Sequence, residues 1–183
     1  MAQTVNNVSA AKPAVGGAVS VGALNATLPT STSSTLTGFT ALGYISEDGL
    51  THNNTPESEE IKAWGGDIVL TPFTGKTDTF TFTLIEALNV EVLKVIYGSS
   101  NVTGTSLSVG YTVNAKAAEL EGHTWVIDMV LRNNVAKRIT IPNGIVSEIG
   151  EVTYADGEAI GYEITVTAFP NSSGVTHYEY IKG

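Results

Sequence analysis

Apolar and polar side chains alternate along several stretches of the chain, with the period of two that is typical of a β-strand. In residues 76–85, Phe80, Phe82 and Leu84 share one face, and threonines occupy the other. Residues 124–132 and 160–169 repeat this pattern, so all three segments predict half-buried strands. Together with one helix, they predict a core that consists of Phe80, Phe82, Leu84, Leu93, Ile96, Trp125, Ile127, Met129, Leu131, Tyr162, Ile164 and Val166.

Weaker strands are predicted in residues 37–46, 105–113, 137–141 and 145–154. The dipeptides expected to form turns are Asp48-Gly49, Asn133-Asn134, Asn143-Gly144 and Asp156-Gly157. Paired glycines at 65 and 66 predict the tight turn of a hairpin over residues 59–71. The preceding residues 47–60 are polar and acidic, and they predict a long loop.

Residues 89–97 predict a helix. Asn89 can cap its first turn, Glu91 complements the helix dipole there, and Gly98 can end the helix in the left-handed conformation. A helix of about ten residues does not persist alone and must pack on the strands. The predicted fold class is therefore mainly β, a β-sandwich or flattened barrel flanked by one short α-helix.

Residues 1–36 differ from the rest, because Lys12 is their only charged residue and they show no regular hydrophobic period. They predict a flexible N-terminal arm, followed by a β domain over residues 37–170 and a C-terminal tail over residues 171–183. The arm is either a disordered terminus or, given its apolar content, a segment that orders against a neighbouring subunit. Deletion of residues 1–35 is expected to leave a folded domain whose assembly is impaired. The residues expected to dock are Val15, Val19, Val21, Leu24 and Leu28.

The charge composition limits the possible partners. Only 15% of the 183 residues are charged, and 18 acidic against 9 basic residues give a net charge of −9. A charge-poor surface favours burial against other subunits, and the acidic surplus argues against a protein that grips phosphates. The absence of cysteine excludes disulfides and zinc–thiolate sites. Residues 1–10 lack a basic, apolar signal pattern and no stretch is apolar enough to span a bilayer, so no membrane partner is expected.

Catalytic motifs are absent from the sequence, which contains neither a Gly-x-Ser-x-Gly elbow nor a phosphate-binding glycine loop. The three histidines, His52, His123 and His177, lie in different segments. His177 and Glu179 have a spacing compatible with a metal pair, but two ligands without a third do not predict a site. The sequence therefore predicts no enzyme, no cofactor and no metal site.

Five segments in a fixed order carry a family resemblance: LGYISEDG at 42–49, IKAWGG at 61–66, FTFTLIE at 80–86 before the helix, RITIPN at 138–143 and GYEITVTAFP at 161–170. Over about residues 37–181, this order resembles the major tail tube protein of long, non-contractile (siphovirus-like) phage tails. The resemblance implies a tail-tube fold and hexameric rings that stack into a hollow tube in the virion tail. It implies assembly in the host cytoplasm with the tape-measure, tail-tip and tail-terminator proteins.

The same resemblance implies an acidic channel through which DNA passes without specific binding, because carboxylates repel phosphates. Candidates for the channel wall are Asp128, Glu148 and Glu163, followed by Asp78 and Asp67. The alternative is that these carboxylates face solvent or pair with Lys and Arg of a neighbouring subunit. Candidates for contact with the next ring are Glu47, Asp48, Glu57, Glu59 and Glu60. Residues 177–182 are expected to add an edge strand to a neighbour.

Two other functions remain open from the sequence. A β-sandwich binding or adhesion module would need an exposed aromatic platform. A tube protein of a contractile tail or a secretion system would share the fold that the resemblance implies.

Overall fold

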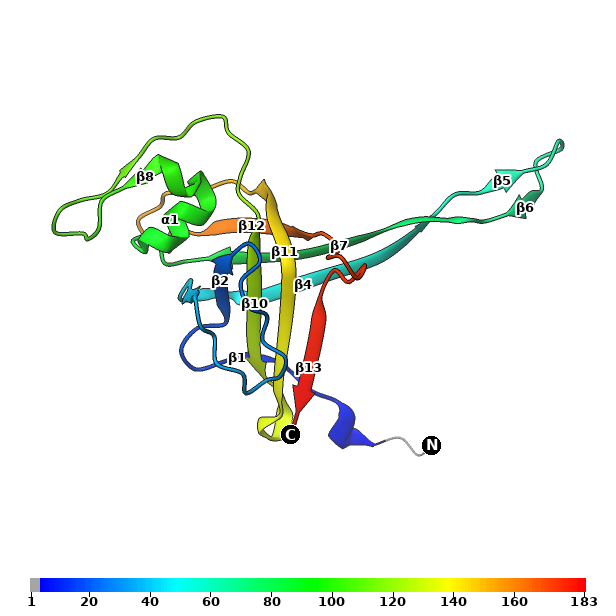
Figure 1. Ribbon diagram of the computed structural model, residues 1–183, viewed down its shortest axis with the longest axis horizontal. Coiled ribbons are helices and arrows are strands. Elements are labelled where there is room, and N and C mark those ends of the chain that lie inside the picture. The colour runs from blue at the N-terminus through cyan, green and yellow to red at the C-terminus, as the bar shows by residue number, and fades with distance from the viewer. Residues whose placement is uncertain (1–3) are drawn as a thin grey trace.

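The computed structural model describes residues 4–183, so the first three residues of the predicted arm lie outside the described part. Within it, nine strands form one antiparallel sheet, and two further strand pairs form small hairpins (Figure 1). The strands of the large sheet are β1 (Lys12–Pro13), β2 (Val19–Ala23), β3 (Phe39–Ala41), β4 (Ile45–Ser58), β7 (Phe73–Leu84), β10 (His123–Val130), β11 (Ala136–Ile149), β12 (Tyr162–Ala168) and β13 (Tyr178–Lys182). The small hairpins are β5 (Ile61–Lys62) with β6 (Ile68–Leu70), and β8 (Val102–Thr103) with β9 (Thr112–Val113).

Strand β11 belongs to both halves of this sheet. Residues 136–140 of β11 pair with β13, and residues 144–149 pair with β12. One half therefore has the order β3-β2-β10-β11-β13, and the other has the order β11-β12-β7-β4. Figure 1 shows β10, β11 and β13 running across the direction of β4 and β7. The apolar faces of the two halves enclose the core, which confirms the predicted mainly β class.

The largest fully buried side chain is Trp125, which meets Phe82 edge to face at 6.2 Å and donates a hydrogen bond to the Gly144 carbonyl at 3.0 Å. Two predicted core residues are not fully buried, one in β10 and one just after its last residue. Met129 is partly buried against the core, and Leu131 is half-buried beside the turn into β11. The other ten are buried, as predicted: Phe80, Phe82, Leu84, Leu93, Ile96, Trp125, Ile127, Tyr162, Ile164 and Val166.

Helix α1 (Val90–Tyr97) has the predicted ends. The Asn89 side chain accepts a hydrogen bond from the Glu91 amide at 3.0 Å, and Gly98 ends the helix at φ 89°. Its apolar residues Val92, Leu93, Val95 and Ile96 are buried in the core. The remaining helical elements are single 3-10 turns, η1 (Val5–Asn7), η2 (Ser99–Asn101) and η3 (Arg132–Asn134). None of the helices in the described residues is long and apolar enough to cross a membrane.

The long loop predicted for residues 47–60 is wrong, because β4 runs through residues 45–58 and pairs with β7 over most of its length. The pair extends away from the body, and the β5–β6 hairpin forms its far end (Figure 1). Both faces of the outer part meet solvent, so its sequence carries no apolar alternation. Asp48-Gly49 does not end the strand either; it lies at an irregularity of register where Gly49 has φ 76°.

The predicted arm is wrong in its second half. Strand β2 lies between β10 and β3 in the sheet, and Val19 and Val21 are buried in the core of the same chain. Of the other predicted docking residues, Val15 and Leu24 are exposed and Leu28 is half-buried. Residues 18–23 are therefore part of the β domain rather than of a separate arm.

Two further predictions about strand ends need correction. Asn143-Gly144 does not form a turn but lies inside β11, where a Cβ on residue 144 would come within 2.7 Å of Trp125. The C-terminal residues are not a separate tail, because β13 pairs with β11 of its own chain. The other edge of β13 has no strand partner among the described residues, so its contact with a neighbour stays a prediction. The turn at Asn133-Asn134 is confirmed, with both residues at φ 59°.

Candidate functional site

The half-sheet β11-β12-β7-β4 presents a polar face opposite its core face. Residues that lie directly opposite one another on paired strands share a face, so the register assigns its members. In its middle, the Thr81 and Thr165 hydroxyls lie 2.9 Å apart. The polar residues of this threonine face are Thr51, Asn53, Thr55, Glu57, Thr77, Thr79, Thr81, Thr83, Glu148, Glu163, Thr165 and Thr167, and the register places Gly75 and Ile145 on the same face. No Lys or Arg is among these residues, and its ionisable groups are all carboxylates.

Glu148 and Glu163 are the two predicted channel residues that lie on the threonine face, and both are exposed. Asp67 lies elsewhere, between β5 and β6 at the far end of the hairpin. Asp128 lies in the other half-sheet and pairs with Arg138 of the same chain, with hydrogen bonds of 2.6 and 2.9 Å. The structure therefore brings two of the five candidates together.

Asp78 contradicts its prediction as a channel residue, because its side chain is fully buried. It has the same parity along β7 as Phe80 and Phe82, so it points to the core face. The alternation of residues along the strand already places Asp78 on the apolar face in the sequence. The prediction instead assumed that a carboxylate would face outward.

The five acidic residues predicted to contact the next ring are all exposed, but they do not gather at one place. Glu47 and Asp48 lie near the beginning of β4, whereas Glu57 lies next to its last residue and Glu59 and Glu60 lead into β5. At about 3.3 Å per residue, the two groups are on the order of 30 Å apart. Only the second group lies near the end of the extended hairpin.

The end of this hairpin also carries exposed apolar side chains. Trp64 in the β5–β6 turn is fully exposed, with a relative accessibility of 107%. Around it, other apolar residues are at least 47% exposed: Ile61, Ile68, Val69, Leu70 and Phe73. We call this group, with Trp64, the hairpin tip. Such a concentration of exposed apolar area on a short hairpin marks a surface for association.

The two edges of the half-sheet that carries the threonine face have no strand partner among the described residues. At one edge, β4 pairs with β7 alone. At the other edge, the pairing of β11 with β10 ends at Gly144, which lies opposite the first residue of β10. Residues 145–149 of β11 continue beyond this point and pair only with β12, on their other side. Unpaired backbone groups at a sheet edge are a ready template for another strand.

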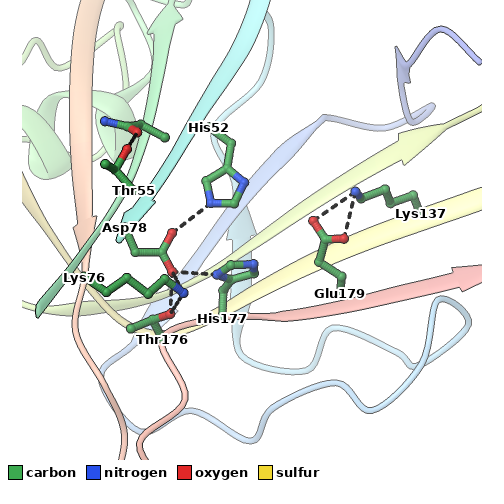
Figure 2. A network of polar contacts seen from close by, with 9 residues as sticks. His52, Thr55, Lys76, Asp78, Lys137, Thr176, His177 and Glu179 are labelled. Atoms are coloured by element: carbon green, nitrogen blue, oxygen red, sulfur yellow. Dashed lines mark hydrogen bonds and ion pairs between the residues drawn. The ribbon is translucent and has the colours of Figure 1, made fainter. Parts of the chain in front are cut away.

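A polar cluster forms where β4, β7 and the C-terminal segment meet (Figure 2). The Asp78 carboxylate lies 2.8 Å from His52 Nε2 and 2.7 Å from His177 Nδ1, and it accepts a further hydrogen bond from the Thr176 hydroxyl. Lys76 Nζ is 3.5 Å away. Burial acts to raise the pKa of the Asp78 carboxyl, but the hydrogen bonds from Thr176, His52 and His177, with the charge of His177, outweigh it and lower the pKa to about 2.

The imidazoles of this cluster are held by stacking as well. His52 lies flat on Phe80, with ring centroids 4.2 Å apart, and meets His177 edge to face at 4.8 Å. Sequence reasoning found the pair His177 and Glu179 but missed His52, which comes from a strand predicted as a loop. No local sequence signal joins residues 52, 78 and 177, because the topology alone brings them together.

Comparison with known proteins agrees with this architecture. Residues 3–182 match the family described as phage tail tube protein. None of the curated proteins compared with the chain matches it. The family match covers nearly the whole sequence, including the strands that were predicted as loop and arm. The chain therefore belongs to the phage tail tube protein family and is a structural component of a phage tail.

Proposed function

We propose that copies of this chain join side by side into hexameric rings, that the rings stack into a tube, and that the threonine face lines the channel through which the genome leaves the capsid. The observation that carries the proposal is the position of this face, which lies between the two unpaired edges of one half-sheet.

The strand directions support ring closure. The half-sheet has four strands, β11, β12, β7 and β4, and each neighbouring pair is antiparallel. The two edge strands therefore run in opposite directions. When subunits are related by rotation about an axis roughly parallel to the strands, β4 of one copy meets residues 145–149 of the next as an antiparallel partner. Such head-to-tail contacts close into a ring if the rotation angle between neighbouring subunits is a full turn divided by a whole number.

The chemistry of the threonine face suits a passage for DNA. Threonine hydroxyls are small and uncharged, and Glu148 and Glu163 add negative charge without a nearby cation on that face. Carboxylates repel phosphates, so the duplex gains no strong contact that would hold it in place. The tube of a long, non-contractile tail is the assembly that the order of sequence motifs favours.

The hairpin tip is the proposed contact between rings. It projects from the body (Figure 1), and its apolar residues gain most when another copy buries them. Glu57, Glu59 and Glu60 flank it and direct it toward a surface that is less acidic. Tape-measure, tail-tip and terminator proteins would meet the ends of the tube, where ring contacts are unfilled.

Electron microscopy of the purified chain tests the assembly. We expect rings or tubes with a central hole in negative stain, if necessary after seeding by a tail initiator. Trp64→Ala should retain the melting temperature of the monomer and lose stacking, whereas the control Leu107→Ala, also at an exposed residue, should assemble normally. A chain that stays monomeric at high concentration with seeds would contradict the proposal.

Hydrogen exchange tests the ring contact itself. In assembled tubes, amides of residues 45–58 and 145–149 should become protected, while those of residues 105–111 between β8 and β9 should exchange as in the monomer. Unchanged exchange at both edges would contradict closure through sheet edges.

A further inference from the structure

The cluster around Asp78 holds two imidazoles on a single buried carboxylate. One carboxylate accepts from two imidazoles through different ring nitrogens, Nε2 of His52 and Nδ1 of His177. Because a carboxylate only accepts, these two nitrogens carry the protons when the rings are neutral. The lone pairs are then fixed on the opposite nitrogens, Nδ1 of His52 and Nε2 of His177. Neither of these atoms has a hydrogen-bond partner within the described residues.

Glu179 completes a set of three donors. It lies in β13, two residues after His177, which comes just before the strand, and Figure 2 shows its carboxylate between the histidines and Lys137, with which it pairs. One ligand atom from each of His52, His177 and Glu179 lies within 4.8 Å of the others. Two ligands on a tetrahedral zinc ion are about 3.3 Å apart, so small side-chain rotations bring the three into a common coordination sphere.

We propose that His52, His177 and Glu179 bind a divalent transition metal ion of the zinc class, with Asp78 orienting both imidazoles from behind. Two imidazole nitrogens and one carboxylate oxygen are ligands that zinc uses, and they leave a fourth position for water. A carboxylate that accepts from the distal nitrogen of a ligating histidine fixes its tautomer and raises its basicity. Here one buried carboxylate does this for two histidines at once.

Accessibility suits exchange of the ion with solvent. The side chains of His177, His52 and Glu179 are 12%, 23% and 35% exposed, whereas Asp78 has no exposure. The ligands come from β4 in one half-sheet and from the C-terminal segment that pairs with β11 in the other. A bound ion would therefore tie the two halves of the sheet together.

Lys137 is the internal competitor for this site. Its Nζ lies 2.9 Å from the Glu179 carboxylate, and Lys137 is half-buried beside the more exposed Glu179. Binding of the ion requires Glu179 to share or release this ammonium group. Removal of the Lys137 charge should therefore strengthen metal binding, which a cluster without metal function has no reason to do.

The test uses the full chain without a histidine tag, stripped with EDTA and titrated with Zn²⁺ by calorimetry. We expect one site of micromolar or tighter affinity, a rise in melting temperature with Zn²⁺ and none with Mg²⁺, and visible absorption of tetrahedral intensity with Co²⁺. Glu179→Gln should weaken Zn²⁺ binding at least tenfold while preserving the Asp78 network. Lys137→Gln should strengthen it several-fold.

Glu148→Gln is the matched control, since it removes the same charge from an exposed glutamate outside the cluster. Its affinity for Zn²⁺ should equal that of the unaltered chain. Equal affinities of Glu179→Gln and Glu148→Gln would overturn the proposal, as would an equal response to Zn²⁺ and Mg²⁺. If Lys137→Gln and the unaltered chain bound Zn²⁺ with equal affinity, Glu179 would not be a ligand, and the three-ligand site would be overturned.

Discussion

Arg138 and Asp128 lie directly opposite each other on β11 and β10, and the guanidinium donates two hydrogen bonds to the carboxylate at 2.6 and 2.9 Å. Arg138 Nη1 also donates to the carbonyl oxygens of Ser31 and Ser34, at 3.0 and 2.8 Å. The ion pair thus fastens the segment between β2 and β3 to the outer face of β10. Along β10, residues 124–127 are buried and residues 128–130, at the end that carries Asp128, are half-buried.

Arg138→Ala should lower the free energy of unfolding by about 3 kcal/mol, because it leaves a largely buried carboxylate and two carbonyls without their donor. Urea denaturation monitored by tryptophan fluorescence measures the change. The control is Lys94→Ala, which breaks a pair with Glu91 whose side chains are both 34% exposed and should cost no more than about 0.5 kcal/mol. Equal losses in the two variants would show that burial does not strengthen the Arg138 pair.

The chain should tolerate truncation from the N-terminus only up to the residues that precede β2. Deletion through residue 10 removes η1 and its contacts with Arg132, and we expect the domain to stay folded. Deletion through residue 23 removes β2, including the fully buried Val19, and should abolish cooperative unfolding. Circular dichroism during thermal melting distinguishes the two. A cooperative transition in the longer deletion would mean that β2 docks without supporting the core.

Acid should remove the stability that Asp78 contributes. Its pKa is about 2 in the folded chain against 3.8 when free, so the folded state favours the ionised form. This contribution is complete above about pH 4, falls as the pH drops through the folded pKa, and reaches about 2 kcal/mol. We expect the difference in unfolding free energy between the unaltered chain and Asp78→Asn, measured in EDTA, to shrink from pH 5 to pH 2. The control is Asp156→Asn, which lies in an exposed turn outside this network.

Charge reversal on the threonine face should slow the passage of DNA. Both glutamates are exposed, so the double variant Glu148→Lys, Glu163→Lys should fold with a change below about 0.5 kcal/mol. In assembled virions, triggered genome release should become slower at low salt and recover as salt screens the lysines. The control, Asp156→Lys with Glu158→Lys, changes the same charge in a turn between β11 and β12. Equal release in both double variants would contradict the assignment of the channel wall.

Much of the body of the fold follows from local sequence. Phe80, Phe82 and Leu84 mark the core face of β7 by simple alternation, and Asn89 and Gly98 mark the ends of α1. These signals involve residues within one turn or one strand, so they survive without knowledge of the tertiary structure.

Most of the errors share a physical cause, which is dependence on distant partners. Strand β2 is short and pairs with a strand about a hundred residues later, so no local pattern identifies it. The outer part of β4 has solvent on both faces, and only its pairing with β7 makes it a strand. The two histidines that flank Asp78 converge for the same reason, and Asp78 itself was misplaced although its parity was visible.

The Asp78 network also sets when, during synthesis of the chain, this part of the fold can be completed. Thr176 and His177, which supply two of the donors to this carboxylate, follow it by 98 and 99 residues. While the chain emerges from the ribosome, β4 and β7 can pair, but Asp78 lacks these donors and must stay hydrated. The buried network around Asp78 is therefore complete only after residues 176 and 177 have emerged, close to the end of the chain.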